Sequence, residues 1–142
     1  MTRTLTVIAL TVSLLHVSCG EDASDSPTAP SDVTPSIEHF SGSLSRGASR
    51  FFSFTVSRDG SASVMLASVT AAASGSPLSI PLRLGLGIPR GTGCDLLTST
   101  MASPALVPQL AQSVTPGIYC VEISDVAAVA DALNFAARFT HP

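Results

Sequence analysis

The chain of 142 residues contains no lysine and no tryptophan, and it has a single tyrosine. Carbohydrate-binding sandwiches usually present exposed aromatic rings as stacking platforms, so this shortage argues against sugar binding. All seven basic residues are arginine, and from residue 37 onward the sequence has six arginines and six acidic residues. Such a domain is near neutral and has no basic stripe, which argues against nucleic-acid binding.

The sequence also lacks the motifs that carry common chemistries. It contains no Gly-x-Ser-x-Gly elbow, and no zinc-protease, calcium-loop or phosphate-loop pattern. Beyond the N-terminal leader only His39 and His141 are present, and His141 is penultimate, where chain ends commonly fray. Two catalytic arrangements that need no local motif remain as alternatives: a Ser-His-Asp triad assembled in space, and a pair of carboxylates that cleaves a glycosidic bond. We interpret Glu122 as part of a solvated face and Asp125 as a turn cap, and we expect no catalytic residues, no cofactor and no metal site.

No apolar run is long enough to span a bilayer, which takes roughly 20 residues. The run from Leu5 to Val17 follows Arg3 and predicts a secretory signal peptide over residues 1–18. The residues Ser18, Cys19 and Gly20 resemble the lipobox of bacterial lipoproteins, although His16 stands where that family usually has leucine. The resemblance implies lipid attachment at Cys19 and a place in the bacterial outer membrane, facing the periplasm or the cell surface. The alternative is an ordinary secretory signal followed by a coincidental cysteine.

Residues 19–36 predict a disordered linker. Their sequence contains Pro27, Pro30 and Pro35 together with four acidic residues and no basic one. A segment so poor in apolar side chains cannot bury enough surface to offset the entropy of ordering, and its prolines favour extended conformations. We therefore expect a spacer between a membrane anchor and a folded domain.

Residues 37–142 predict one small all-β domain, a β-sandwich or jelly roll. Apolar and polar residues alternate in four runs, which is the pattern of strands buried on one side. These runs are 50–57, 77–89, 117–124 and 133–140. Turn residues separate the strands, notably Asp59-Gly60, and several short strands at this spacing favour two packed sheets. Pro81 predicts an edge or bulge within its run, and the segment from Asp125 to Leu133 leaves room for a helical turn.

The order of these runs resembles a known family. Residues 40–44 (FSGSL), 52–56 (FSFTV), 116–121 (PGIYCV) and the closing strand 135–139 resemble the bacterial pre-peptidase C-terminal domain and its lipoprotein-borne relatives. The resemblance spans residues 37–142 and implies a small β-sandwich without catalytic residues. It also implies a role in secretion or in binding surfaces such as polysaccharide. In this chain no protease domain precedes the sandwich.

Cys94 and Cys120 remain once Cys19 is assigned to lipid. An exported compartment permits a disulfide, and a small domain benefits from one. The alternatives are free thiols or a metal site, but a metal site would need further Cys or His ligands at short spacing. We expect a Cys94–Cys120 bridge.

Three hypotheses for function follow. The first is a non-enzymatic, membrane-tethered, exported β-sandwich with a structural or interaction role. The second is a carbohydrate- or protein-binding module at the cell surface, with Phe51 as its outward aromatic side chain. The third is a small hydrolase. The membrane, through the N-terminal lipid, and a protein or polysaccharide ligand are the expected partners.

Overall fold

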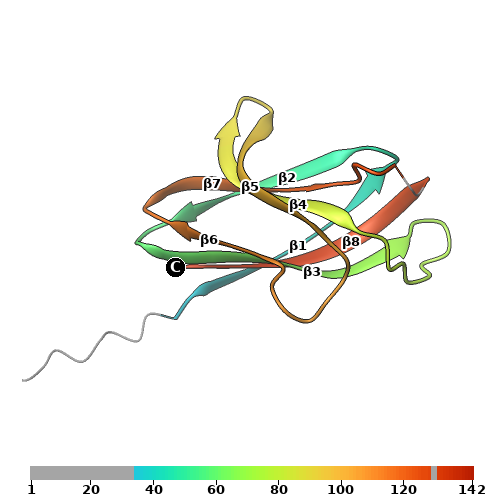
Figure 1. Ribbon diagram of the computed structural model, residues 1–142, viewed down its shortest axis with the longest axis horizontal. Coiled ribbons are helices and arrows are strands. Elements are labelled where there is room, and N and C mark those ends of the chain that lie inside the picture. The colour runs from blue at the N-terminus through green and yellow to red at the C-terminus, as the bar shows by residue number, and fades with distance from the viewer. Residues whose placement is uncertain (1–33, 129–130) are drawn as a thin grey trace, which may run out of the picture. The chain divides into compact units, whose positions relative to one another are not determined.

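A computed structural model describes residues 34–128 and 131–142, so the predicted leader, Cys19 and all but the end of the predicted linker lie outside these residues. In this part of the chain eight strands form two four-stranded antiparallel sheets that pack face to face as a sandwich (Figure 1). The predicted all-β sandwich is therefore confirmed. The strands are β1 (Ser36–Ser45), β2 (Ser49–Val56), β3 (Gly60–Ala71), β4 (Leu82–Arg90), β5 (Gly93–Ala102), β6 (Leu110–Val114), β7 (Gly117–Ser124) and β8 (Ala132–His141).

The strand pairing is nested around one hairpin. One sheet has the order β1-β8-β3-β6 and the other β2-β7-β4-β5. The chain therefore pairs its first strand with its last, its second with its seventh, its third with its sixth and its fourth with its fifth. This is the jelly-roll arrangement, in which a long antiparallel ribbon rolls up into two sheets. The β4–β5 hairpin is the tip of that ribbon.

The core lies between the two sheets and is built from alternate residues of the strands. Phenylalanines from both sheets meet there: Phe40 and Phe139 have ring centroids 4.6 Å apart, and Phe52 lies 4.5 Å from Phe40. Around them pack aliphatic side chains that are almost completely buried, among them Leu66 and Leu84. The two-residue period of the sequence thus corresponds to one inward face for each sheet.

The prediction that the alternating run 77–89 forms one strand is wrong. Strand β4 begins only at Leu82, directly after Pro81, which has no N–H to donate to a neighbouring strand. Leu78 and Ile80 still pack against the core, but from the connection that precedes the strand. At the other end, a register shift between Leu86 and Gly87 is followed by Ile88, which is 49% exposed rather than buried.

Strands β5 and β6 were not predicted. Both are edge strands, and the adjacent Leu96 and Leu97 interrupt the alternation in β5. The loop between these strands runs beside β3, where the side chain of Gln109 accepts a hydrogen bond from Leu66 N (2.8 Å) and donates to Leu66 O (3.3 Å). This loop is therefore attached to β3, although its own apolar residues Leu106 and Val107 are exposed.

The C-terminal end of the sandwich is ordered, so the expectation that the chain frays around His141 is wrong. His141 pairs with Ser36 at the end of the β1–β8 ladder, and its side chain is buried. The ring lies 5.0 Å from the ring of Phe54, and Nε2 lies 3.0 Å from Oε1 of Glu38. Pairing with β1 also places Ser36 within the first strand, one residue before the predicted start of the domain.

Asp125 closes the opposite end of the β2–β7 pair. Its residue is buried, and its carboxylate accepts a hydrogen bond from the backbone N–H of Gly47 at 3.2 Å. Gly47 has a φ of 71°, a left-handed conformation that suits glycine in the turn between β1 and β2. The described residues after Asp125, up to Ala128, form a turn rather than a helix.

Candidate functional site: a disulfide-closed hairpin

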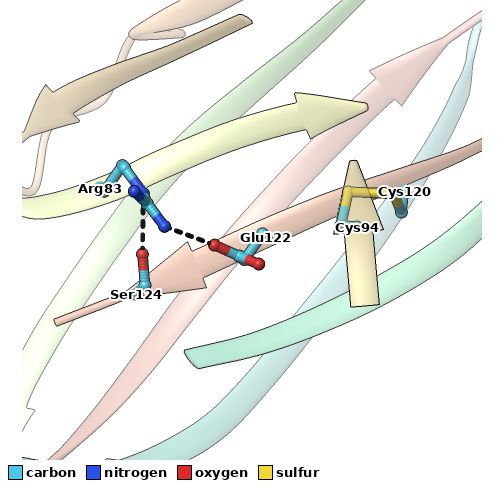
Figure 2. A network of polar contacts seen from close by, with 5 residues as sticks. All are labelled: Arg83, Cys94, Cys120, Glu122 and Ser124. Atoms are coloured by element: carbon cyan, nitrogen blue, oxygen red, sulfur yellow. Dashed lines mark hydrogen bonds and ion pairs between the residues drawn. A yellow bond between two sulfur atoms is a disulfide. The ribbon is translucent and has the colours of Figure 1, made fainter. Parts of the chain in front are cut away.

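The predicted disulfide is present and ties the β4–β5 hairpin to strand β7. Cys94 and Cys120 have sulfur atoms 2.04 Å apart and Cα atoms 5.9 Å apart, and they are 26 positions apart in sequence. Cys120 pairs with Gly87 in the ladder, so the bridge reaches across β4 to β5 on the face of the sheet that points away from the core (Figure 2). Closing a loop of this length stabilises a fold by about 3 to 4 kcal/mol in the chain-entropy treatment.

Two glycines of β4 allow β5 to lie close to that outer face. A Cβ on Gly87 would overlap the carbonyl oxygen of Asp95, and a Cβ on Gly85 would lie 2.6 Å from Cδ2 of Leu96. The register shift in this pair leaves Leu97 without a partner in β4 and bends β5. The Gly85/Gly87 pair fits no dinucleotide-binding turn. These glycines instead leave the space in which Leu96 and the backbone of Asp95 pack against β4.

A polar network lies on the same outer face, next to the bridge. Arg83 on β4 donates from Nη2 to Oε1 of Glu122 (2.8 Å) and from Nε to Oγ of Ser124 (3.1 Å), both on β7 (Figure 2). Only 14% of the Glu122 side chain is exposed. The prediction that Glu122 is part of a solvated face is therefore wrong, because a neighbouring strand supplies its cationic partner. Sequence alone offered no signal for this pairing, since 39 positions separate Arg83 from Glu122.

The aromatic residues near this face divide into one outward and one inward side chain. Phe51 on β2 is paired with Glu122 and is partly exposed. Tyr119 packs against the core, and its hydroxyl oxygen accepts a hydrogen bond from Thr115 N at 3.2 Å. Phe51 and Glu122 thus lie side by side, an apolar ring beside a carboxylate, on the face that carries the disulfide.

The candidate catalytic residues are not brought together. His39 is exposed on β1 and pairs with Arg138, whereas the ring of His141 contacts Glu38 and the carbonyl of Pro142. Neither histidine is hydrogen-bonded to a serine within residues 34–128 and 131–142. In the same ranges there is no detectable pocket and no group of three or more Cys, His, Asp or Glu residues that would hold a metal.

The N-terminal site residue, Cys19, lies outside the described residues, so the predicted lipid attachment stays a prediction. Across the part of the chain that the structure covers, no helix has the length and apolar character needed to cross a bilayer. No protein-family model matches the chain, and no curated protein is similar to it in sequence.

Proposed function

We propose that this chain is an exported, membrane-tethered β-sandwich that acts as a non-enzymatic interaction module. The observation that carries the proposal is the Cys94–Cys120 bridge, which closes the central hairpin of the fold. Structural disulfides form and persist in oxidising compartments and are rare in the cytosol. The bridge therefore supports export.

The tether rests on the remaining cysteine. With Cys94 and Cys120 joined, Cys19 is the one cysteine of the sequence outside the bridge, and it follows an apolar leader and a small residue. Lipidation at that position would explain an odd number of cysteines in an exported protein. A lipid contributes about 0.8 kcal/mol of membrane affinity for each buried CH₂ group, so two or three acyl chains anchor a protein firmly.

The interaction role is supported by an uncharged stretch. Residues 96–121 contain no acidic residue, arginine or histidine. Five of the eight large apolar side chains that are exposed in the described residues fall in this stretch. They are Leu97, Met101, Leu106, Val107 and Ile118. Single exposed apolar side chains are ordinary on a protein surface, but five of them in one uncharged stretch, with Leu97 and Met101 on the same edge strand, favour a binding role.

The resemblance to the pre-peptidase C-terminal domain fits the same proposal. The matching positions include Phe54, Val56 and Val121, which are buried in the core. The shared pattern is thus a pattern of core residues, and it agrees with a sandwich module that has no catalytic residues of its own. The proposed location is the outer membrane, because Gly20 follows Cys19. In Gram-negative bacteria a lipoprotein with a residue other than aspartate after the lipidated cysteine is expected to go there.

The anchor is tested by fractionating cells that express the full chain. Cys19→Ala should move the protein from detergent-requiring to soluble fractions. The control is Cys94→Ala/Cys120→Ala, which removes the bridge and leaves the anchor, so it should stay with the membrane. Unchanged partitioning of Cys19→Ala would contradict the tether.

A second candidate function is binding of a carbohydrate or protein ligand at Phe51. The partly exposed ring beside the Glu122 carboxylate favours it, since sugars stack on aromatic faces and bond to carboxylates. Glycan-array binding that disappears in Phe51→Ala and persists in Thr55→Ala, an exposed residue of the same strand, would support this candidate. Equal binding by both variants would reject it.

A further inference from the structure

Strand β5 is a sheet edge without the features that usually block pairing with another chain. It is the last strand in the order β2-β7-β4-β5, so only β4 pairs with it among the described strands. Edge strands are commonly protected by charge, by proline or by being very short. From Leu96 to Ala102 the strand contains no charged residue and no proline.

The other three edges differ from β5. Strand β1 carries Glu38 and His39, and β2 carries Arg50. Strand β6 is uncharged but has only five residues, against ten in β5. Strand β5 also carries one charge, Asp95, but the seven residues that follow it, 96–102, contain no charge and no proline, against six such residues in β1 (40–45) and six in β2 (51–56). Among the described strands β5 therefore offers the longest open edge.

The sequence of this edge is chemically the same in both directions around Ser99. Thr98 and Thr100 flank Ser99, and the next positions on either side are Leu97 and Met101. In an antiparallel pair that is centred on Ser99, position numbers of facing residues add up to 198. Leu97 then faces Met101 of the second strand, Thr98 faces Thr100, and Ser99 faces itself.

We propose that β5 pairs with β5 of a second copy of this chain, antiparallel and about a two-fold axis at Ser99. The pairing joins two four-stranded sheets into one continuous sheet. A two-fold contact is the commonest way in which identical chains associate. The proposal does not depend on the lipid anchor or on the proposed binding role.

The side chains of β5 favour this occupant. Leu97 is 58% exposed and Met101 is 48% exposed in the single chain. In the proposed register each would cover the other across the axis, and Thr98 would face Thr100; apolar and Thr–Thr pairs are among those that stabilise sheets. In this register no charged residue faces its own copy, because Asp95 would face Ser103 of the second chain.

The register is tested by cross-linking single cysteines in the full chain carrying Cys19→Ala. Ser99→Cys should form a disulfide dimer in more than half of the molecules under mild oxidation, because residue 99 faces itself. Met101→Cys is a matched control on the same edge. It would lie roughly 13 Å from its own copy, at about 3.3 Å for each of four residues, beyond the 7 Å that a disulfide tolerates. Equal cross-linking at both positions would overturn the proposal.

Association itself is measured by sedimentation equilibrium of the same chain without the added cysteine. We expect a dimer whose dissociation constant rises at least tenfold in Met101→Lys and does not change in Thr55→Lys, on the opposite edge strand β2. Circular dichroism and the intact mass of the bridged chain check that each variant is folded. A chain that stays monomeric at 100 μM, or a dimer that Met101→Lys does not weaken, would overturn the pairing.

Discussion

Leu96 lies over Gly85 on the outer face of the β2-β7-β4-β5 sheet, so close that a Cβ at position 85 would come within 2.6 Å of its Cδ2 atom. Two residues further along β4, a Cβ on Gly87 would meet the backbone of Asp95 instead of a side chain. The hairpin that the disulfide closes thus rests on two glycines, but against two kinds of neighbour. A flexible side chain can move, whereas a paired backbone cannot move without breaking its ladder.

We expect Gly87→Ala to cost more stability than Gly85→Ala. Overpacking commonly costs about 1 to 3 kcal/mol, and we place Gly85→Ala near the lower value and Gly87→Ala at or above the upper one. Gly93→Ala is the control, since its nearest neighbour would be 3.9 Å away; it should change the free energy of unfolding by less than about 1 kcal/mol. Urea unfolding measures all three, and equal losses at positions 85 and 87 would contradict the close backbone approach.

Removing the bridge should lower stability without changing the fold. Cys94→Ala/Cys120→Ala is expected to reduce the free energy of unfolding by about 3 to 4 kcal/mol, because the unfolded chain gains the freedom of a loop of this length. The circular-dichroism spectrum should remain that of a β protein. Intact-mass measurement of the chain that keeps both cysteines should find two hydrogen atoms fewer before reduction than after it. Alkylation of both thiols in the native, unreduced protein would disprove the bridge.

The Arg83–Glu122 ion pair, which joins β4 to β7, should stabilise the fold more than the Arg90–Asp95 pair of the β4–β5 hairpin. The side chains of Arg83 and Glu122 are 37% and 14% exposed, whereas those of Arg90 and Asp95 are 83% and 65% exposed. A double-mutant cycle with alanine should yield a coupling of about 1 kcal/mol for the first pair and near zero for the second, as exposed pairs generally do. The first coupling should also weaken less with added salt. Equal couplings would show that the Glu122 carboxylate is solvated after all.

The two histidines of the domain should differ sharply in their effect on stability. His141→Ala removes a buried ring that contacts Phe54 and Glu38, and we expect a loss of about 1 to 3 kcal/mol. His39→Ala changes an exposed residue and should fall within about 0.5 kcal/mol of the unmodified protein. Thermal unfolding compares the two. Identical midpoints would mean that the last residues of β8 do not contribute to the fold.

The strands that the sequence predicted correctly share a local property. In β2, β7 and β8 most of the alternate positions that face the core are large and apolar, among them Phe54, Val121 and Phe139, which are buried. A two-residue period is a property of the strand itself, so it is visible without knowledge of the partner. Strands β5 and β6 lack a clear period, because Leu96 and Leu97 are adjacent in β5 and the polar Gln112 stands between the buried Leu110 and Val114 of β6.

The candidate site shows the same division. The cysteine count and the predicted compartment were enough to pair Cys94 with Cys120. Arg83 and Glu122 are 39 positions apart, and His141 contacts Glu38 from the other end of the domain. The close approach of the Asp95 backbone to Gly87 likewise depends on how the hairpin folds. No local pattern records which distant backbone or charge a residue will meet.

For this protein the sequence by itself determined the all-β class, the inward face of the regular strands and the identity of the bridge, because alternation and cysteine number are counted along the chain. The tertiary structure decided the strand order, the open edge at β5 and the place of each glycine and charge. Those features arise when the ribbon rolls up, since only then do β4, β5 and β7 come within contact of one another.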